Sequence, residues 1–408
     1  MSSSSEPIAI IGAGPIGLAA AAHLHARGLT ALILERGPSA GHNIRAWGHV
    51  QLFSPWSMNI DDRAAELLHA GGWTAPPDDV CPTGEAFVRD YLAPLSRVTP
   101  IRDCLRLGTR VAAVSRLHHD KMKTPGREQA PFVLRVVDAD GEHDLHAAAV
   151  IDTSGTFHNP APLGCHGIAA RGETALAEHI RYGLPDVLGE ARSRYAGRRV
   201  MVVGGGHSAF TALRDLAELA ESSPDTRVLW AIRRDSIEGM FCGAASDSLP
   251  ERGRLACTIS DLVDKGAIEV HCGVRIDAVE KVAGGVQVHS GQTPSKEKPV
   301  PAVDEIIAAT GFRPDSALLA ELRLALDPAT ESPVALAPLI DPNVHSCGSV
   351  GAHGAEELSH PEPGLYIAGI KSYGRAPTFL LRTGYRQVAS IAAALAAESE
   401  PAVSTGAA

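Results

Sequence analysis

The sequence predicts an α/β fold in which two separate strand–helix–strand units each form around a glycine-rich turn. The first turn, Gly12–Gly17, follows the β-branched run Ile8–Ile11 and precedes an alanine-rich stretch that is typical of a helix. The second turn, Gly204–Ala209, has the same setting near the middle of the chain. Such units imply parallel strands joined by right-handed crossovers. The predicted fold class is therefore α/β with two Rossmann-like dinucleotide-binding domains.

The remaining elements are predicted from periodicity and from turn residues. Residues 38–100 are expected to be mostly irregular, because proline and tryptophan are frequent there and no strong period is present. The basic stretch His118–Arg127 is expected to form an exposed turn, and Ser290–Pro301 a loop. The predicted helices are 18–27, 61–69, 209–221 and 378–395, and the predicted strands are 8–11, 31–34, 111–117, 131–137, 142–146, 200–203, 228–232, 306–309 and 365–368.

Composition and charge exclude several classes of protein. The chain has 408 residues, 45% of them hydrophobic and 21% charged, which is typical of a globular enzyme of two or three domains. A net charge of −10 disfavours nucleic acid as a partner. No apolar stretch approaches the roughly 20 residues that span a bilayer, and the serine-rich start lacks the basic residues of a secretory signal. We therefore expect a cytoplasmic protein without a membrane partner, and a homo-oligomer is compatible with the sequence.

The first glycine turn has the pattern of a dinucleotide-binding site. Gly12 permits the tight turn, Gly14 lets the backbone approach a pyrophosphate, and Gly17 allows the helix to pack closely on the strand. Glu35 ends the second strand, 23 residues after Gly12 (35 − 12), where a carboxylate is expected to hold the adenosine ribose. The candidate binding residues of this turn are Gly12, Gly14, Pro15, Ile16, Gly17, Glu35 and Arg36.

The second glycine turn carries a different charge at the end of its second strand. Ala209 replaces the third glycine, which is a permitted variant, and Arg233-Arg234 stand where the first unit has its carboxylate. Guanidinium groups suit a 2′-phosphate, so NADPH is favoured over NADH, although arginines at a strand end can also simply be solvated. The candidate binding residues are Gly204, Gly206, His207, Ser208, Ala209, Arg233 and Arg234.

These motifs resemble those of the two-dinucleotide-binding flavoproteins and, within them, the flavin-containing monooxygenases. The resemblance rests on the two glycine turns, on Asp152-Thr-Ser-Gly155 and on the stretch from Ala309 to Asp315, and it spans nearly the whole chain. Bacterial members of unassigned substrate, some encoded beside arsenic-resistance genes, are the most similar group. The resemblance implies FAD at residues 1–165 and 302–408, with an NADPH domain of residues 166–301 inserted between them. It also implies that Trp47, Thr310, Gly311, Gly369 and Thr378 contact the cofactors.

Two nucleotides in one chain imply hydride transfer from NADPH to the flavin. The sequence also limits which molecule can be the final electron acceptor. None of the seven cysteines forms a C-x-x-C pair, so a dithiol reductase is not favoured, and the odd number of thiols does not suggest a disulfide framework. No G-x-S-x-G nucleophile motif is present. No metal site is expected either, because Cys165-His166 and His271-Cys272 each lack a second pair of ligands nearby in the sequence.

Dioxygen is the favoured acceptor, with a small molecule as the substrate. In the related monooxygenases the region after the first unit lies along the flavin and carries an asparagine, so Asn59 is a candidate to stabilise a flavin hydroperoxide; its alternative role is to cap the helix 61–69. Lys371 and Arg375 precede the last helix and are candidates to stabilise the charge of reduced flavin, unless they only solvate the surface.

The sequence therefore predicts an FAD-containing, NADPH-dependent monooxygenase that oxygenates a nitrogen, sulfur or arsenic atom of a small molecule. Its candidate catalytic residues are Asn59, Lys371 and Arg375. A reductase of quinone-like acceptors is the first alternative. It is disfavoured because that branch of the superfamily ends its last strand with Gly-Asp, whereas this chain continues Gly369-Ile370-Lys371. A non-catalytic nucleotide sensor is the second alternative.

Overall fold

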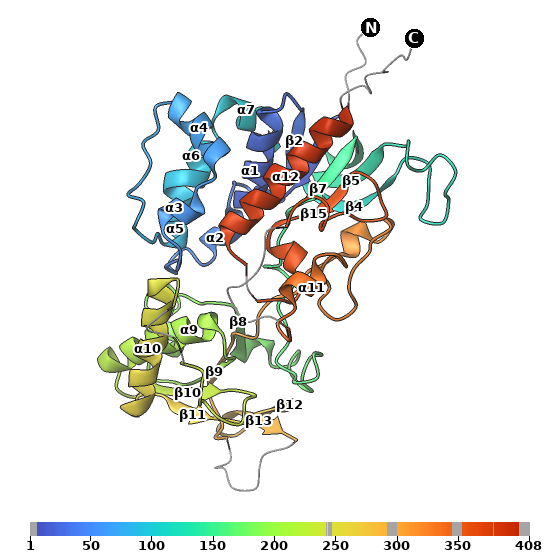
Figure 1. Ribbon diagram of the computed structural model, residues 1–408. Helices are drawn as coiled ribbons and strands as arrows, with labels where there is room; N and C mark the ends of the chain where they lie inside the picture. Colours follow the sequence, from blue (N-terminus) through green and yellow to red (C-terminus); the bar gives the residue numbers. More distant parts are fainter. Residues whose placement is uncertain are drawn as a thin grey trace, which may run out of the picture. The chain divides into compact units, whose positions relative to one another are not determined.

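The chain folds into two compact units. The structure is a computed structural model that describes residues 6–241, 243, 247–291, 300–344, 353–377 and 379–399. Unit 1 contains the residues up to Gly48, Pro55–Phe157 and the residues from Arg313 onward. Unit 2 contains His49–Ser54 and His158–Phe312. Figure 1 shows the ribbon of the chain with its helices and strands labelled.

The boundaries between the units differ from those predicted. The sequence analysis places them after residues 165 and 301, whereas the structure places them after residues 157 and 312. Backbone pairing explains the difference. Residues 158–161 pair with the end of the second unit, through a bridge between Pro160 and Phe312 and a 2.9 Å hydrogen bond from the Ala161 amide to the Gly311 carbonyl. The strand at 305–308 likewise pairs inside the sheet of unit 2.

Unit 1 is built on a five-stranded parallel sheet. The order of its strands is β15-β7-β1-β2-β3, so the chain crosses over rather than forming hairpins. Strand β1 is buried along its whole length, as expected for an apolar run covered on both faces of a parallel sheet. The strands are β1 (Ile8–Ile11), β2 (Ala31–Leu34), β3 (Leu105–Arg106), β7 (Ala149–Asp152) and β15 (Leu365–Ile367).

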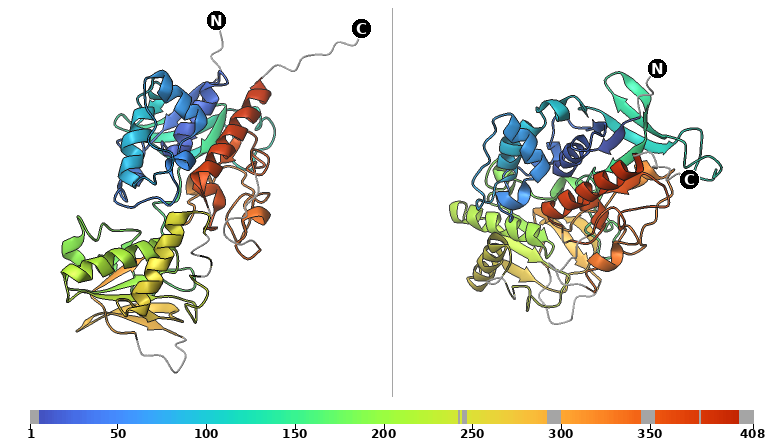
Figure 2. Two further views of the ribbon diagram at one scale, coloured as in Figure 1. Left: turned by 60° about the vertical axis from the view of Figure 1, so that its left-hand side comes forward. Right: turned by 45° about the horizontal axis from the view of Figure 1, so that its top comes forward.

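Two long helices of unit 1 lie side by side over this sheet (Figures 1 and 2). They are α1 (Pro15–His25) and α12 (Leu381–Ser399). Small residues allow the close contact, since a Cβ atom on Gly384 of α12 would lie 2.5 Å from the Cδ1 atom of Ile16 on α1. Because Ile16 stands in the first turn of α1, the packing brings the C-terminal helix to the glycine turn.

A second sheet of unit 1 is antiparallel, as the predicted meander requires. Its strands are β4 (Arg110–Arg116), β5 (Phe132–Asp138) and β6 (Gly141–Ala147). The turn between β4 and β5 is not exposed throughout. Arg127 is 1% exposed and donates to Glu362, which Arg116 also contacts, so the basic stretch is anchored in the protein by a buried carboxylate.

The region 38–100 is more regular than predicted. It contains α2 (His42–Arg45), α3 (Trp56–Asn59), α4 (Asp62–Ala70), α5 (Gly84–Phe87), a π-helical turn (Val88–Leu92), α6 (Ala93–Leu95) and α7 (Thr99–Arg102). Helix α5, the π-helical turn and α6 follow one another without a break and form one helical stretch over residues 84–95. The helices α2, α3 and α7 are single turns, too short to show a 3.6-residue period in the sequence. The other short helices of unit 1 are 317–319, α11 (Ala337–Ile340) and 369–373.

Unit 2 repeats the parallel arrangement with a different strand order, β11-β10-β9-β14-β8. Helix α9 follows the glycine turn and packs against α10 (Figure 2). The sequence analysis did not predict helix α10. The strands are β8 (Ile180–Tyr182), β9 (Arg199–Val203), β10 (Arg227–Ala231), β11 (Glu269–His271), β14 (Glu305–Ala308) and the hairpin β12 (Ile276–Val282) and β13 (Gly285–Ser290). The helices are 177–179, α8 (Arg192–Tyr195), α9 (His207–Ser222) and α10 (Pro250–Asp264).

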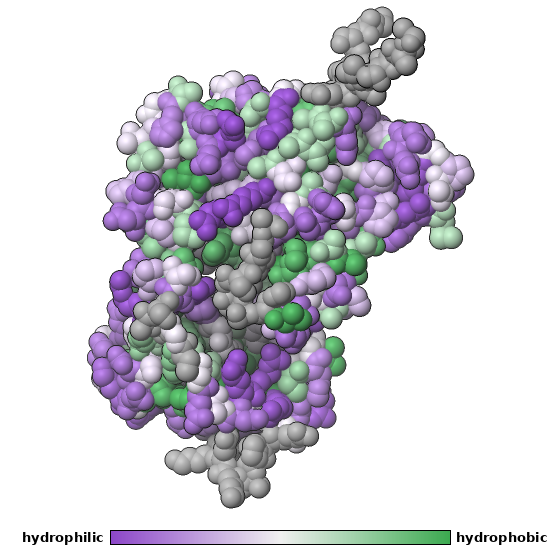
Figure 3. Space-filling view, in the orientation of Figure 1, coloured by the Kyte–Doolittle hydropathy of each residue, from purple (hydrophilic) through white to green (hydrophobic). Residues whose placement is uncertain are grey.

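The face drawn in Figure 3 is largely hydrophilic, with apolar residues scattered among polar ones. Across the described residues, no helix combines the length and the apolar character needed to cross a membrane. The α/β class with parallel sheets that the sequence predicts is confirmed.

Candidate functional site

The glycine turn of unit 1 needs glycine for steric reasons. Gly12 has a φ of 102°, which disfavours a side chain, and a Cβ atom on Gly17 would lie 2.0 Å from the carbonyl oxygen of Gly12. Thr153, directly after β7, fixes the turn from the neighbouring strand. Its hydroxyl is 2.9 Å from the carbonyl oxygen of Ile11 and 3.2 Å from that of Gly12. The sequence analysis quoted the segment around Thr153 as a motif but assigned this residue no role.

Gly14 leaves open the space that a bound phosphate would need. It is the N-cap residue of α1 with an ordinary φ of −77°, and no heavy atom lies within 4 Å of the position of an added Cβ. Pro15 occupies the first helical position, where its missing N–H costs no hydrogen bond. The amides of the first turn have no partners within the helix, and the helix dipole favours an anion there. The turn therefore fits the pyrophosphate of a dinucleotide.

Glu35 is held at the carboxyl end of β2 by two backbone amides. Its Oε2 atom accepts from the Ala13 amide at 2.8 Å, and its Oε1 atom accepts from the Gly37 amide at 2.7 Å. Each oxygen keeps a lone pair that can accept from a ribose hydroxyl. The carboxylate thus ties the glycine turn to β2 and remains available to a ligand, while the neighbouring Arg36 is exposed.

The segment after β15 lies against the first turn of α1 within unit 1. Gly369 has a φ of 74°, and a Cβ atom there would lie 3.2 Å from the Cγ1 atom of Ile16. The Gly369 amide donates to the Oε1 atom of Gln387 on α12 at 2.8 Å, and the Gln387 side chain donates to Ser372 at 2.9 Å. Gln387 therefore positions this segment, which no local pattern of the sequence predicted. Thr378 lies outside the described residues.

The two cations of this segment lie in opposite environments. The ammonium group of Lys371 is 2.6 Å from the Oδ2 atom of Asp152 and 3.0 Å from the hydroxyl of Ser154, and both charged side chains are at most 1% exposed. Lys371 is therefore not a surface residue. Arg375 is partly exposed and forms an ion pair with Glu331. Each cation thus has a carboxylate partner, and the predicted role of both at reduced flavin stays a prediction.

Asn59 does not cap α4, which was its alternative role. It is the last residue of α3 and is fully buried, and its backbone oxygen accepts from the hydroxyl of Tyr385 at 2.6 Å. The cap of α4 is Asp61, whose carboxylate accepts from the Ala64 amide at 3.0 Å. The predicted role of Asn59 at the flavin stays a prediction. Trp47 is partly buried and packs on Gly84.

The glycine turn of unit 2 repeats the geometry of the first. Gly204 has a φ of 139°, and a Cβ atom there would lie 2.3 Å from the carbonyl oxygen of Ala309. Gly206 is the N-cap residue of α9 and has an extended backbone, with no heavy atom within 4 Å of an added Cβ. The indole N–H of Trp230 donates to the Gly204 carbonyl at 2.7 Å and fixes the turn from β10. This cradle also fits a pyrophosphate.

His207 and Ser208 are exposed at the start of α9, whereas Ala209 is buried. The His207 ring makes edge contacts with Phe53 at 5.5 Å and with Phe210 at 5.9 Å between ring centroids. Partial desolvation by these neighbours, and then the positive charge of Arg252, lower the pKa of His207. The imidazole is therefore neutral at pH 7 and can donate or accept one hydrogen bond at the helix terminus.

Arg233 and Arg234 follow β10 and are both exposed. Within the described ranges, no carboxylate forms an ion pair with either guanidinium group. Two exposed cations at the carboxyl end of the second strand suit a phosphate ester on the adenosine ribose.

Thr310 and Gly311 lie at the end of unit 2, just before the chain returns to unit 1. The Thr310 hydroxyl donates to the Ala161 carbonyl, and Gly311 has a φ of 92°. These contacts give both residues a structural role, and their predicted contact with a cofactor stays a prediction.

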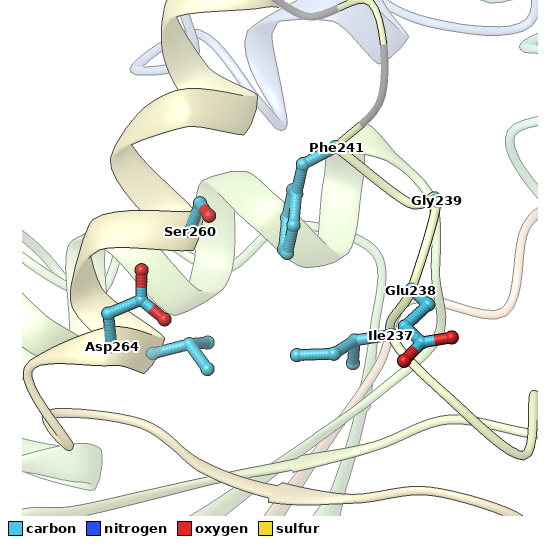
Figure 4. A pocket seen from close by; sticks show the side chains of 7 residues that line it. Ile237, Glu238, Gly239, Phe241, Ser260 and Asp264 are labelled. Carbon is cyan, nitrogen blue, oxygen red and sulfur yellow. The ribbon is translucent and has the colours of Figure 1, made fainter.

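An apolar hollow of about 380 Å³ lies beside α10 in unit 2. Figure 4 shows that Phe241, Ile237, Ser260 and Asp264 line it. The charged groups in its lining, Glu238 and Asp264, are both acidic. The hollow would therefore repel the phosphates of a nucleotide, and the glycine turns remain the candidate sites.

Comparison with known proteins decides the family. The model of the pyridine nucleotide-disulphide oxidoreductase family matches residues 9–69 and 133–337, which include both glycine turns and more than half of the chain. The chain belongs to this family. It is therefore a flavin-dependent oxidoreductase with FAD and NADPH as cofactors, as the sequence analysis predicts.

Relatives and solved structures include both reductases and monooxygenases. A ferredoxin–NADP reductase of Salinispora tropica is 28% identical over 78% of this chain and 78% of its own length. A flavin-containing monooxygenase of Arabidopsis thaliana is 23% identical over 54% of this chain and 51% of its own length. A bacillithiol disulfide reductase of Bacillus cereus has a TM-score of 0.67 at 20% identity, covering 97% of this chain and 100% of that chain. A flavin monooxygenase of Stenotrophomonas maltophilia has a TM-score of 0.63 at 22% identity, covering 97% and 99%.

Proposed function

We propose that this protein is an NADPH-dependent flavin monooxygenase that transfers one oxygen atom from dioxygen to a nitrogen, sulfur or arsenic atom of a small molecule. The observation that carries the proposal is the charge difference between two otherwise similar cradles. The first has the carboxylate of Glu35 at the end of its second strand, and the second has the exposed guanidinium groups of Arg233 and Arg234. The first suits the unmodified ribose of FAD, and the second suits the 2′-phosphate of NADPH.

The chain's own residues bind and orient the cofactors. The first turn of α1 and the open space over Gly14 receive the FAD pyrophosphate, while Glu35 accepts from the ribose hydroxyls. The first turn of α9 and the open space over Gly206 receive the NADPH pyrophosphate. When bound, the flavin supplies the redox chemistry, accepting a hydride from NADPH and activating dioxygen.

The positions of the cysteines favour dioxygen over a disulfide as the acceptor of electrons from the flavin. No C-x-x-C pair exists in the sequence. Among the described cysteines, burial raises the pKa of the Cys104 thiol to about 11, and burial followed by a hydrogen bond to Asp277 raises that of Cys165. Neither is a reactive thiolate. The monooxygenases among the relatives support the same acceptor. A cytoplasmic location, the absence of nucleic acid and membrane partners, and a homo-oligomeric state remain predictions.

Oxygen-isotope labelling tests the proposal. The purified holoprotein is supplied with NADPH and ¹⁸O₂ and screened against amines, thioethers and arsenicals by mass spectrometry. We expect a product that carries one ¹⁸O atom and forms in proportion to the NADPH consumed. Acceptor-dependent NADPH oxidation without oxygen incorporation would identify a reductase instead, and binding of both cofactors without NADPH oxidation would identify a sensor.

Two matched glycine variants separate the cradles. In Gly14→Val and Gly206→Val, the new side chain enters open space on extended backbone, so the fold tolerates both changes while the side chain occupies the phosphate position. We expect Gly14→Val to purify colourless. We expect Gly206→Val to keep its flavin but to require at least tenfold more NADPH for flavin reduction. The reverse pattern would show that the two cofactors are assigned to the wrong cradles.

A further inference from the structure

A cysteine, a histidine and an aspartate meet on the surface of unit 2, away from both glycine turns in the sequence. Cys165 and His166 are adjacent in the chain, and Asp277 is on β12, 112 residues after Cys165. The Sγ atom of Cys165 and the Nε2 atom of His166 are each 3.6 Å from the Oδ1 atom of Asp277. One ligand atom of each residue lies within 4.8 Å of the others.

The two separations from the Asp277 oxygen match a tetrahedral metal ion. Zinc binds thiolate sulfur, imidazole nitrogen and carboxylate oxygen at about 2.0–2.3 Å, so neighbouring ligand atoms in a tetrahedral site are about 3.3–3.8 Å apart. The two distances to the Asp277 oxygen already lie in this range. A metal ion binds Cys165 only after displacing the thiol proton. The resulting thiolate, the carboxylate and a neutral imidazole together carry two negative charges, which balance a divalent cation.

The backbone holds the ligands in place. The register of β12 against β13 shifts between Ile276 and Ala278, so Asp277 stands at a bulge that redirects its side chain. The loop that carries the other two ligands pairs with β12 on both sides of them. The Cys165 amide donates to the Ile276 carbonyl at 2.9 Å, and the Arg171 amide donates to the Asp277 carbonyl at 2.9 Å.

The glycines beside the ligands complete this rigid turn. Gly167 has a φ of 80°, and its amide donates to the Gly164 carbonyl at 3.1 Å. A Cβ atom on Gly164 would lie 2.0 Å from the carbonyl oxygen of Ile168. The ligand pair therefore stands on a closed turn that is hydrogen-bonded to the strand carrying the third ligand.

We propose that Cys165, His166 and Asp277 form a binding site for a thiophilic divalent cation, with zinc as the probe. The side chain of His166 is 72% exposed and that of Asp277 is 27% exposed, so an ion can enter from solvent. Three protein ligands leave a fourth position open to water. The positive charge of Arg233 acts on Cys165, so the site is not remote from the residue proposed to bind the 2′-phosphate. Its test does not use enzyme activity.

Metal titration of the full-length protein tests the site. The protein is freed of metal with a chelator, and zinc chloride is titrated in competition with a chromophoric chelator. We expect one zinc ion per chain, bound at least tenfold more weakly by each of Cys165→Ser, His166→Ala and Asp277→Asn. With cobalt chloride we expect a thiolate-to-cobalt charge-transfer band in the wild type that Cys165→Ser lacks.

Two control variants make the result specific. Cys257→Ser removes an exposed thiol on α10, and His289→Ala removes an exposed histidine that contacts Glu280 at 3.2 Å on the same hairpin. Both should bind zinc as the wild type does. Because the side chain of His166 is mostly exposed, His166→Ala should fold even if Asp277→Asn does not. The proposal is overturned if no zinc binds, if His166→Ala or Cys165→Ser binds it unchanged, or if a control variant loses as much affinity.

Discussion

The buried ion pair between Lys371 and Asp152 gives the strongest stability prediction for unit 1. Replacing Lys371 with methionine keeps most of the side-chain volume and removes the charge. The Oδ2 atom of Asp152 would then lose its 2.6 Å partner, while Oδ1 keeps its 3.0 Å hydrogen bond from the Ser154 amide. Because Asp152 is 0% exposed, water cannot replace the ammonium group without a change in packing.

The expected loss follows from this burial. Breaking a buried ion pair on one side costs about 3–5 kcal/mol, because the remaining charge stays desolvated. Unit 1 has roughly 250 residues, for which 1 kcal/mol corresponds to about 2–4 °C in melting temperature. We therefore expect Lys371→Met to lower the Tm of unit 1 by about 6–20 °C. Removing both charges, in Lys371→Met with Asp152→Leu, should restore much of this loss, since an apolar pair leaves no unpaired charge.

Differential scanning calorimetry of the single and double variants measures the effect. The matched control is Arg63→Met, which breaks an ion pair of similar length, 2.7 Å to Glu66, between side chains that are 49% and 60% exposed. We expect no measurable change in Tm for this control. A wild-type Tm for Lys371→Met would refute the reasoning, because it would mean that Asp152 reaches water or another cation.

Three further outcomes are expected. Arg233→Ala and Arg234→Ala should each raise the KM for NADPH about 10- to 150-fold, because each removes a charged hydrogen bond to the 2′-phosphate. The KM for NADH, which lacks this phosphate, should not change. Equal changes in KM for both nucleotides would exclude a contact with the 2′-phosphate. Gly17→Ala places a Cβ atom 2.0 Å from a carbonyl oxygen of the turn, so thermal melting should show a loss of about 1–3 kcal/mol together with lost flavin. Burial lowers the pKa of His360 from 6.5 to about 4. The unfolded chain therefore gains a proton near pH 6.5 that the folded chain gains only near pH 4, so stability falls by up to about 3 kcal/mol as the pH drops through this window. Urea titrations at several pH values should show this slope in the wild type and lose it in His360→Leu.

Both nucleotide cradles were predictable because their chemistry is local. A glycine turn between a buried strand and a helix needs only a few consecutive residues, and the steric reason for Gly17, which would meet the Gly12 carbonyl, holds within one strand–helix–strand unit. The atoms that crowd Gly12 and Gly204 come instead from Thr153 and Ala309, more than 100 residues away in the chain. The carboxylate of Glu35 is likewise placed by the length of a single crossover. Six strands of the two parallel sheets were predicted from an apolar run that is visible in the sequence, namely β1, β2, β9, β10, β14 and β15, whereas β3, β7, β8 and β11 were not predicted.

The surroundings of the catalytic candidate Lys371 were not predictable, because they depend on partners distant in the chain. Lys371 and Asp152 are 219 residues apart, and nothing near either residue indicates that the two side chains meet in the core. The same holds for Arg127, which is in a polar stretch but is buried against Glu362, 235 residues later. Charge in a loop therefore predicts exposure only where no buried carboxylate lies within reach.

The same reasoning applies to the zinc-site candidate and to the acceptor. Cys165-His166 alone does not make a metal site, and only the bulge at Asp277 supplies the third ligand. In contrast, the choice of dioxygen over a disulfide rests on a pattern that the sequence lacks throughout, a pair of nearby cysteines. A dithiol can also be assembled from distant cysteines, as the zinc-site candidate is assembled from distant ligands. Oxygen labelling is therefore the decisive test of the acceptor, because it reports where the electrons go whichever residues of the fold are brought together.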